Sequence, residues 1–473
     1  MAKTITGKKL ASNVIISVAA QLISLAIGFF LNLIVPKFID ELQYAHWQTY
    51  LLYVSYVGIL HFGLLDGFML RYAQYDYEEL DKERVRSIFK ALLIFTGTLT
   101  LVTSCISLVF VQGISKQVVI LVAIGITSKN LYTYNSYSFQ STNRIQKYAL
   151  LVISQRLVYG LGIAVCLILG VQNFVWFCIA DLAGDMLSAL LVFRSNKGMY
   201  LGKALPLKEG WAEVLKNVSS GIMLMLANWS AMLIVNSAKM IVQWRWDSLV
   251  FGKVSFAFSL ANIVLSFITA VSIVLFPSLK RLDENKLPSL YKTLRGVLSP
   301  LLLGALLLYF PGCWILEMWL PKYLPSLTYL GILLPIIVFT SKVTLLTNTY
   351  LKTYRKEKQM LLINVFSACI GVVACLLCAY VFHDLTALLI SIVAVVMLNS
   401  ILSECIVLRV IKVRIWKEFV LEGVLVAAFI LAVQYLPLWT ACLVYLGAFL
   451  MYCLVNMQSI KTLITSLLQR RKK

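Results

Sequence analysis

Three basic residues stand inside apolar stretches that are long enough to cross a membrane: Lys129, Arg156 and Lys342. A lone basic group at the centre of a bilayer costs about 2.5–3.5 kcal/mol on insertion scales. A chain that keeps such a charge usually provides a partner or a ligand for it. Phosphate makes strong charge-assisted hydrogen bonds with Lys and Arg, so these residues predict a phosphorylated, anionic ligand.

Two of the three belong to one repeated motif. Thr127-Ser128-Lys129, Asn135 and Tyr137 recur 213 positions later as Thr340-Ser341-Lys342, Asn348 and Tyr350. Asn32 and Asn236 also match, at an offset of 204. We interpret these matches as two halves inserted in the same orientation, with a substrate path at their interface. Lys129 and Lys342 are then expected at one depth on opposing walls.

The composition is that of a polytopic membrane protein. The 473 residues are 60% hydrophobic and 13% charged, with a mean hydropathy of +0.86, whereas soluble domains are about a quarter charged. An all-α fold is predicted, because about 20 apolar residues make one spanning helix. Fourteen segments fit, near 11–35, 47–70, 88–111, 117–139, 148–170, 173–193, 214–238, 249–278, 296–316, 324–351, 359–382, 385–408, 418–436 and 438–460.

The basic residues predict the topology. Alternate connections hold most of the 42 Lys and Arg residues, so the positive-inside rule places both termini in the cytoplasm. The C-terminal run Arg470 to Lys473 is interpreted as a topology anchor on anionic membrane lipid. The net charge of +21 is explained in this way, and no nucleic-acid partner is predicted.

The domain prediction follows the repeat. Residues 1–195 form an N-terminal six-helix lobe, 196–212 a cytoplasmic linker with Gly and Pro, and 213–415 a C-terminal six-helix lobe. Residues 416–473 add helices 13 and 14 and a basic tail. The two lobes are expected to surround a central cavity.

Several classes of function are disfavoured. The three histidines and ten cysteines show no metal-ligand spacing, and no phosphate-binding glycine loop or Ser/His/Asp pattern is present. Neither a metal nor another cofactor is predicted, and the chain is not expected to be an enzyme. A membrane-embedded polysaccharide polymerase or ligase would show a large outer loop, and the outer connections here are short.

Polar residues in the apolar segments are candidates for lining the cavity. The fourth segment ends in a run of Tyr, Ser, Thr, Asn and Gln over 132–143, which cannot face hydrocarbon on all sides. The alternative to a cavity wall is, for the tyrosines, a belt at the membrane–water interface. For the asparagines, the alternative is hydrogen bonding between helices. The substrate-binding candidates beside the three cations are Tyr134, Asn135, Tyr137, Asn348, Tyr350, Asn32 and Asn236.

Acidic residues give a second set of candidates. A tight hairpin between the fifth and sixth segments brings Arg156 level with Asp185, so a structural ion pair is expected unless Arg156 binds the ligand. Asp181 and Asp185 share one helix face. If Arg156 does not neutralise them, they are candidates for a coupling proton or sodium ion. Asp66 with Arg71, and Glu404 with Arg409, are expected to pair locally.

The pattern resembles the polysaccharide transporter family within the multidrug/oligosaccharidyl-lipid/polysaccharide exporter superfamily. The similar motifs are Gly63-Leu64-Leu65-Asp66-Gly67 with Arg71-Tyr72, the run Phe139 to Leu150, and the run Tyr350 to Lys358. The resemblance implies a flippase that works by alternating access. It would carry an undecaprenyl-diphosphate-linked oligosaccharide from the inner to the outer leaflet of a bacterial cytoplasmic membrane, for capsule or O-antigen-type polysaccharide.

The resemblance also leaves room for partners among the membrane proteins of polysaccharide assembly. Peptidoglycan-precursor and teichoic-acid translocation stay open within this hypothesis. An exporter of cationic drugs with the same fold is the main alternative, and it would need acidic cavity walls.

Overall fold

The computed structural model describes residues 7–280, 287–354, 356–413 and 415–455. These residues form helices joined by short turns, in two compact units, 1–229 and 230–473. The predicted C-terminal anchor Arg470 to Lys473 lies outside the described residues. The division between the units falls inside one continuous helix, α9 (Leu207–Arg245, 39 residues).

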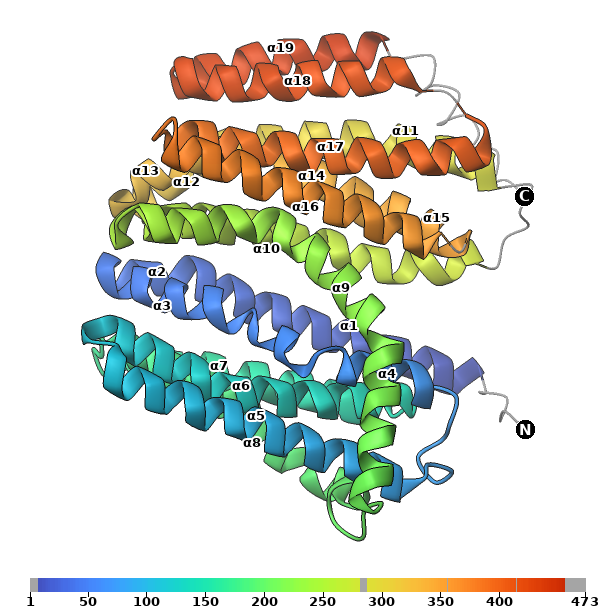
Figure 1. Cartoon of the computed structure of the whole chain (residues 1–473). Helices are drawn as coiled ribbons and strands as arrows, with labels where there is room; N and C mark the ends of the chain where they lie inside the picture. The colour runs from blue at the N-terminus through green and yellow to red at the C-terminus, as the bar shows by residue number, and fades with distance from the viewer. Residues whose placement is uncertain (1–6, 281–286, 355, 414, 456–473) are drawn as a thin grey trace. The chain divides into compact units, whose positions relative to one another are not determined.

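Unit 1 contains the helices before α9 and the first part of α9 itself. Within it, α5, α6, α7 and α8 pack side by side, α1 packs on α7, and α3 and α4 pack on α6 (Figure 1). The helices are α1 (Gly7–Phe29), η1 (Phe30–Ile34), α2 (Val35–Phe38), α3 (Glu41–Val54), η2 (Val57–His61), α4 (Leu64–Tyr72), α5 (Lys82–Phe110), α6 (Gly113–Ser141), α7 (Ile145–Ile168) and α8 (Phe174–Tyr200).

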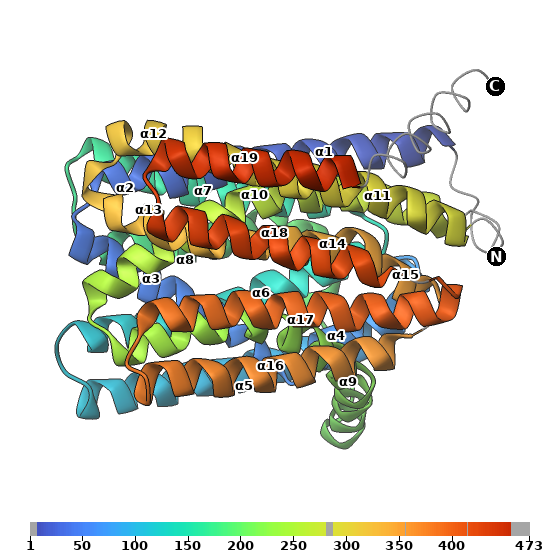
Figure 2. The ribbon, with the colours of Figure 1, turned by 90° about the horizontal axis from the view of Figure 1, so that it is seen from above.

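Unit 2 contains the remaining helices. α16 packs along α17, α14 lies against α10 and α17, and α18 and α19 form a pair that packs on α11, α12 and α13 (Figure 2). The helices are α10 (Ser248–Lys280), α11 (Leu287–Ala305), η4 (Leu306–Leu308), α12 (Tyr309–Trp319), η5 (Pro321–Tyr323), α13 (Leu324–Leu333), α14 (Pro335–Lys342), η6 (Val343–Thr347), α15 (Asn348–Thr353), α16 (Glu357–Tyr380), α17 (Leu385–Ile411), α18 (Trp416–Tyr435) and α19 (Leu438–Val455).

Local sequence explains where several helices begin. Asp40, Asp81, Asn173 and Asp384 each precede a helix and accept hydrogen bonds from its first free backbone N–H groups. Such caps satisfy donors that have no partner inside the helix. They begin α3, α5, α8 and α17.

The predicted all-α membrane fold is confirmed. Eleven helices have the length and hydropathy of a membrane span, and two bent pairs raise that number to thirteen. With α18, which has 20 residues, the described part of the chain agrees with about fourteen predicted spans.

Two of the predicted spans are bent. The span from α3 to α4 turns by 59°, where Phe62 and Gly63 adopt positive φ angles of 50° and 79°. The span from α13 to α15 turns by 41° at Leu334-Pro335, because proline lacks the N–H that continues a helical ladder. A π-helical segment, η6, follows directly after Lys342.

The predicted linker 196–212 is partly helical. Residues 196–200 are the last of α8, which ends at Tyr200, and α9 begins at Leu207. Arg86 of α5 fixes the short connection by donating to the carbonyls of Gly198 and Lys203, each at 2.9 Å.

Candidate functional site

Lys129 of α6 forms a charged cluster with two aspartates of α8. Its Nζ lies 2.8 Å from Asp181 and 2.8 Å from Asp185. The two aspartates are four residues apart on one face of α8, so one ammonium reaches both carboxylates. Asp181 and Asp185 are buried, and the Lys129 side chain keeps 23% of its surface exposed.

Neutral side chains complete this cluster. The Tyr50 hydroxyl donates to Asp181 at 2.9 Å, and the Gln155 amide donates to Asp185 at 3.2 Å. With both aspartates ionised, the cluster has one more negative charge than positive charge. Arg156 does not neutralise these aspartates, because Lys129 is the ion-pair partner of both. Asp181 and Asp185 therefore remain candidates for a coupling ion.

Arg156 is not the partner of Asp185, and that expectation is wrong. Arg156 is the twelfth of the 24 residues of α7 and is exposed. No carboxylate lies within ion-pair distance of it among the described residues. A hairpin brought the two residues to one depth but did not fix which way each side chain points.

The position of Arg156 on α7 shows that it does not belong to the most exposed face of the helix. The exposed leucines Leu157 and Leu161 lie on another line of α7, since each residue turns the helix by about 100°. Gly160, one turn after Arg156 on the same face, lies against Ile27 of α1. Arg156 is thus an exposed cation on a face that is otherwise buried.

Lys342 forms a second charged cluster, within unit 2. Its Nζ lies 2.6 Å from Glu422 of α18 and 3.1 Å from Glu404 of α17. Arg295 of α11 also pairs with both glutamates. The Tyr291 hydroxyl donates to Glu404 at 2.7 Å, so two cations and two carboxylates balance one another.

The structure contradicts the premise that Lys342 is accessible to an anion. Its side chain is 2% exposed and both of its partners are buried. The physical reason is charge balance, because two carboxylates already neutralise Lys342 and Arg295. Lys129 keeps partial exposure, and its role in ligand binding stays a prediction.

Three of the polar candidates are buried and have hydrogen-bond or ring partners. Asn135 accepts hydrogen bonds from Asn196 of α8, at 3.1 Å, and from the Tyr200 hydroxyl. Tyr134 packs against the rings of Phe68, Phe89 and Tyr200. Tyr350 is 1% exposed and donates to the Leu287 carbonyl at 3.0 Å. These three side chains are thus buried in this structure, and their predicted place on a cavity wall stays a prediction.

The other polar candidates are partly exposed. Asn32 donates to the Gly28 carbonyl at 2.7 Å, one turn earlier in its own helical segment. Tyr137, Asn236 and Asn348 are half-buried. Their contact with a ligand stays a prediction.

Sequence reasoning missed three members of the unit 2 cluster. Glu422 lies inside an apolar segment, which is itself a signal of function or pairing, and Arg295 had been assigned to a connection. Glu404 was expected to pair with Arg409 but pairs with Arg295 and Lys342. Residues five apart in a helix point about 140° apart, so the expected local pair was sterically unfavourable.

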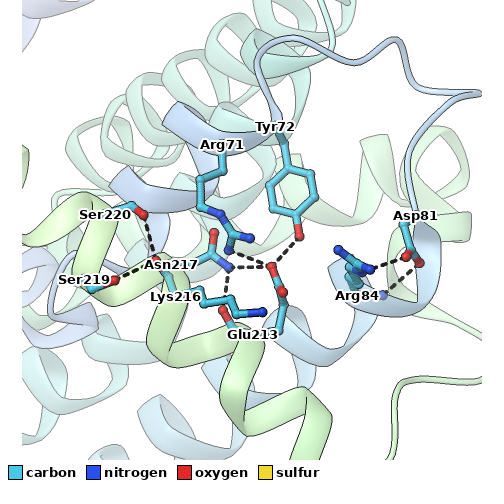
Figure 3. Close-up of polar contacts among 9 residues, drawn as sticks. All are labelled: Arg71, Tyr72, Asp81, Arg84, Glu213, Lys216, Asn217, Ser219 and Ser220. Atoms are coloured by element: carbon cyan, nitrogen blue, oxygen red, sulfur yellow. Dashed lines mark hydrogen bonds and ion pairs between the residues drawn. The ribbon is translucent and has the colours of Figure 1, made fainter.

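The same error affects Asp66 and Arg71. Asp66 lies 3.7 Å from His61, whereas Arg71 pairs with Glu213 of α9 at 2.6 Å. Figure 3 shows Glu213 receiving Arg71, the Tyr72 hydroxyl and the Asn217 amide on one carboxylate. This network binds the first part of α9 to α4.

Glycines bring these two helices into backbone contact. A Cβ on Gly67 would lie 1.8 Å from the Asn217 carbonyl oxygen, and one on Gly221 would lie 2.1 Å from the Gly63 carbonyl oxygen. Small residues four apart permit such close crossings in membrane helices. The first part of α9 is therefore held in unit 1 by both packing and charge.

No group of three or more metal-ligand side chains occurs among the residues that the structure describes. The candidate site is formed by the exposed Arg156 of α7 and, on the neighbouring helices α6 and α8, the Lys129 cluster.

No protein-family model and no curated protein matches the sequence. Solved structures do match it. The structure of the lipid II flippase MurJ in an inward closed conformation has a TM-score of 0.67 and 13% identity, over 94% of this chain and 99% of that chain. The chain shares the fold of this structure over nearly its whole length.

Two further matches are described as transporters of the MOP superfamily. An inward-facing multidrug resistance MATE transporter of the MOP superfamily gives a TM-score of 0.60 at 13% identity, over 83% of this chain and 98% of that one. A MOP superfamily transporter from Pyrococcus furiosus gives 0.50 at 11%, over 85% and 95%. The expected fold is confirmed: the chain shares its fold with these solved transporters and has the apolar helices of a multi-pass membrane protein.

Proposed function

We propose that this chain is a flippase for an undecaprenyl-diphosphate-linked oligosaccharide. It would move this lipid from the inner to the outer leaflet of a bacterial cytoplasmic membrane by alternating access, for the synthesis of surface polysaccharide. The fold supports a flippase or exporter, and one of the similar structures is a lipid II flippase. The choice of an anionic cargo rests on the residues of this chain.

Arg156 is the observation that carries the proposal. It is exposed at the middle of an apolar helix, and no described carboxylate pairs with it. A guanidinium in such a place needs an anionic partner. A diphosphate supplies one, because its oxygens match the planar donors of arginine. Lys129 has a lesser part, since two aspartates already hold its ammonium.

The Lys129 cluster supports a proposal about coupling. Two buried carboxylates share one ammonium, so a proton or a sodium ion would balance the remaining negative charge. We assign Asp181 and Asp185 to the coupling ion on this basis. Lys129 links them to the helix that also contains the polar run 132–143.

An exporter of cationic small molecules is the second candidate. The excess negative charge of the Lys129 cluster favours it. The exposed Arg156 opposes it, because a cationic substrate near that guanidinium would be repelled. The two candidates therefore predict opposite effects when the charge of Arg156 is removed.

The test uses purified protein in vesicles with a labelled polyprenyl-diphosphate oligosaccharide. Arg156→Gln should reduce transfer between the leaflets by about tenfold or more, as expected for one lost charge-assisted contact, and Arg156→Lys should retain part of it. Arg194→Gln, which removes an exposed arginine of α8, is the matched control. Transfer by Arg156→Gln at the parent rate would contradict the proposal. Faster export of a cationic dye by that variant would support the second candidate.

A further inference from the structure

A pocket that combines basic and apolar residues lies at the end of α17, within unit 2. It has a volume of about 440 Å³ and lies between the last turn of α17 and the first turn of α18. Leu408, Ile415 and Phe419 supply apolar walls, and Arg409 and Lys412 supply charge. The basic connections predict that this end of the unit faces the cytoplasm.

A second pocket lies on the other side of Arg409. It has a volume of about 260 Å³, and Leu362 and Ile363 of α16 and Ile406 of α17 line it, together with Lys356. Figure 2 shows the start of α16 beside the end of α17. Arg409 lines both pockets, so the two slots share this residue.

The cations at these pockets have no acidic partners among the residues that the structure describes. Arg409 and Lys412 are exposed, and the nearby Glu404 and Glu422 are committed to Arg295 and Lys342. The Phe419 ring lines the larger pocket, and the Arg295 Cζ lies 5.4 Å from the centroid of the same ring. Glu404 and Glu422 therefore do not neutralise Arg409 and Lys412, and neither of these two cations forms an ion pair with Glu418 or any other described carboxylate.

Backbone geometry holds Lys412 at this rim. It has a φ of 55° at the end of α17, a left-handed conformation that costs a non-glycine residue about 1–2 kcal/mol. The next residue, Val413, closes the turn by donating to the Leu408 carbonyl at 3.1 Å. Glycine is the usual residue at this position of a helix end, and the chain has a lysine instead.

Trp416 places the pocket at the depth of lipid headgroups. It lines the larger pocket, and 66% of its surface is exposed. Tryptophan is enriched where the membrane meets water. An acidic peptide would match the charges but would leave the two apolar slots and this ring without partners.

We propose that this site binds an anionic glycerophospholipid of the surrounding membrane, such as phosphatidylglycerol. The phosphate contacts Arg409 and Lys412, and the two acyl chains enter the slots on either side of Arg409. Basic pockets between membrane helices on the cytoplasmic side recognise anionic headgroups in this way. The proposal does not depend on which substrate the protein transports.

The test uses the full chain in nanodiscs that contain brominated lipids, which quench nearby tryptophans. Brominated phosphatidylglycerol should quench more than brominated phosphatidylcholine at the same mole fraction. This excess should disappear in Trp416→Phe, which removes this one of the ten tryptophans and so shows which of them is quenched. The double variant Arg409→Gln/Lys412→Gln should weaken the preference for phosphatidylglycerol by about tenfold or more.

The control is Lys203→Gln/Lys208→Gln, which removes two exposed lysines of unit 1 and changes the net charge equally. It should keep the excess quenching. Equal quenching by the two lipids would overturn the proposal, as would the same loss in the control pair. Displacement of phosphatidylglycerol by equimolar undecaprenyl phosphate would assign the site to a polyprenyl lipid, and displacement by an acidic peptide would assign it to a protein. Either displacement overturns the phospholipid assignment.

Discussion

In unit 1, Lys129 faces two aspartates with one positive charge, whereas in unit 2 Lys342 and Arg295 face two glutamates with two. Each cluster also has a tyrosine hydroxyl that donates to one carboxylate. The first cluster is partly exposed and carries an excess negative charge. The second is buried and balanced. Under the proposed function the first cluster would bind the coupling ion, whereas the second, with its charges balanced, contributes to the stability of its unit.

Removing the cation from the balanced cluster should have the largest effect on stability. Lys342→Met leaves two buried glutamates with Arg295 alone, and breaking a buried ion pair costs about 3–5 kcal/mol. We expect a clearly lower melting temperature in detergent. Lys352→Met, which changes an exposed lysine of α15, is the control. The combination Lys342→Met/Glu422→Gln should recover part of the loss, and a parent-like melting temperature for Lys342→Met alone would break the comparison.

The same change in unit 1 should cost less. Lys129→Met also strands two carboxylates, but its side chain is 23% exposed, so water can compensate part of the charge. We expect a loss of about 1–3 kcal/mol, below the buried limit, measured in the same melting experiment. The prediction fails if Lys129→Met is less stable than Lys342→Met. Addition of Asp185→Asn should restore part of the loss, because only Asp181 then lacks a cation.

Asp185→Asn alone should separate the role of this aspartate in stability from its proposed role in ion coupling. It removes the excess charge of the Lys129 cluster and keeps an oxygen that can accept from Gln155, so stability should change by only about 1 kcal/mol. Transport in vesicles should no longer respond to an imposed proton or sodium gradient. Asp76→Asn, at an exposed position, should respond like the parent. A normal gradient response in Asp185→Asn would remove this aspartate from coupling.

The smallest effect on stability is expected at the exposed cation. Arg156→Gln removes a charge that has no described ion-pair partner, and changes at such sites usually stay within about 0.5 kcal/mol. Its melting temperature should match that of the parent even though transfer of the lipid falls. A large loss of stability would show that Arg156 has a structural partner.

The sequence predicted the helices better than the contacts between them. Long apolar runs indicate spanning helices directly, and their number and the fold class followed from composition alone. The charged clusters join helices that are far apart in sequence, such as α14 and α18. Which face of a helix packs against its neighbour depends on tertiary contacts, and these cannot be read from a single sequence.

The errors at individual residues have the same cause. Arg156 and Asp185 were placed at one depth correctly enough to suggest a pair, but Asp185 points toward Lys129. Intramembrane charge alone would have identified Glu422, which lies in an apolar segment like Lys342. Lys129 and Arg156 could be identified as candidates from the sequence. That Lys129 pairs with two carboxylates and Arg156 with none could not be predicted.

The contribution of Glu422 from α18 also has a consequence for biosynthesis. A ribosome makes Arg295 and Lys342 first, Glu404 next and Glu422 last. A nascent chain that ends before α18 therefore carries one surplus cation that the finished protein neutralises. This cluster can reach charge balance only when α18 arrives, so its four side chains can pair fully only after that helix has been made.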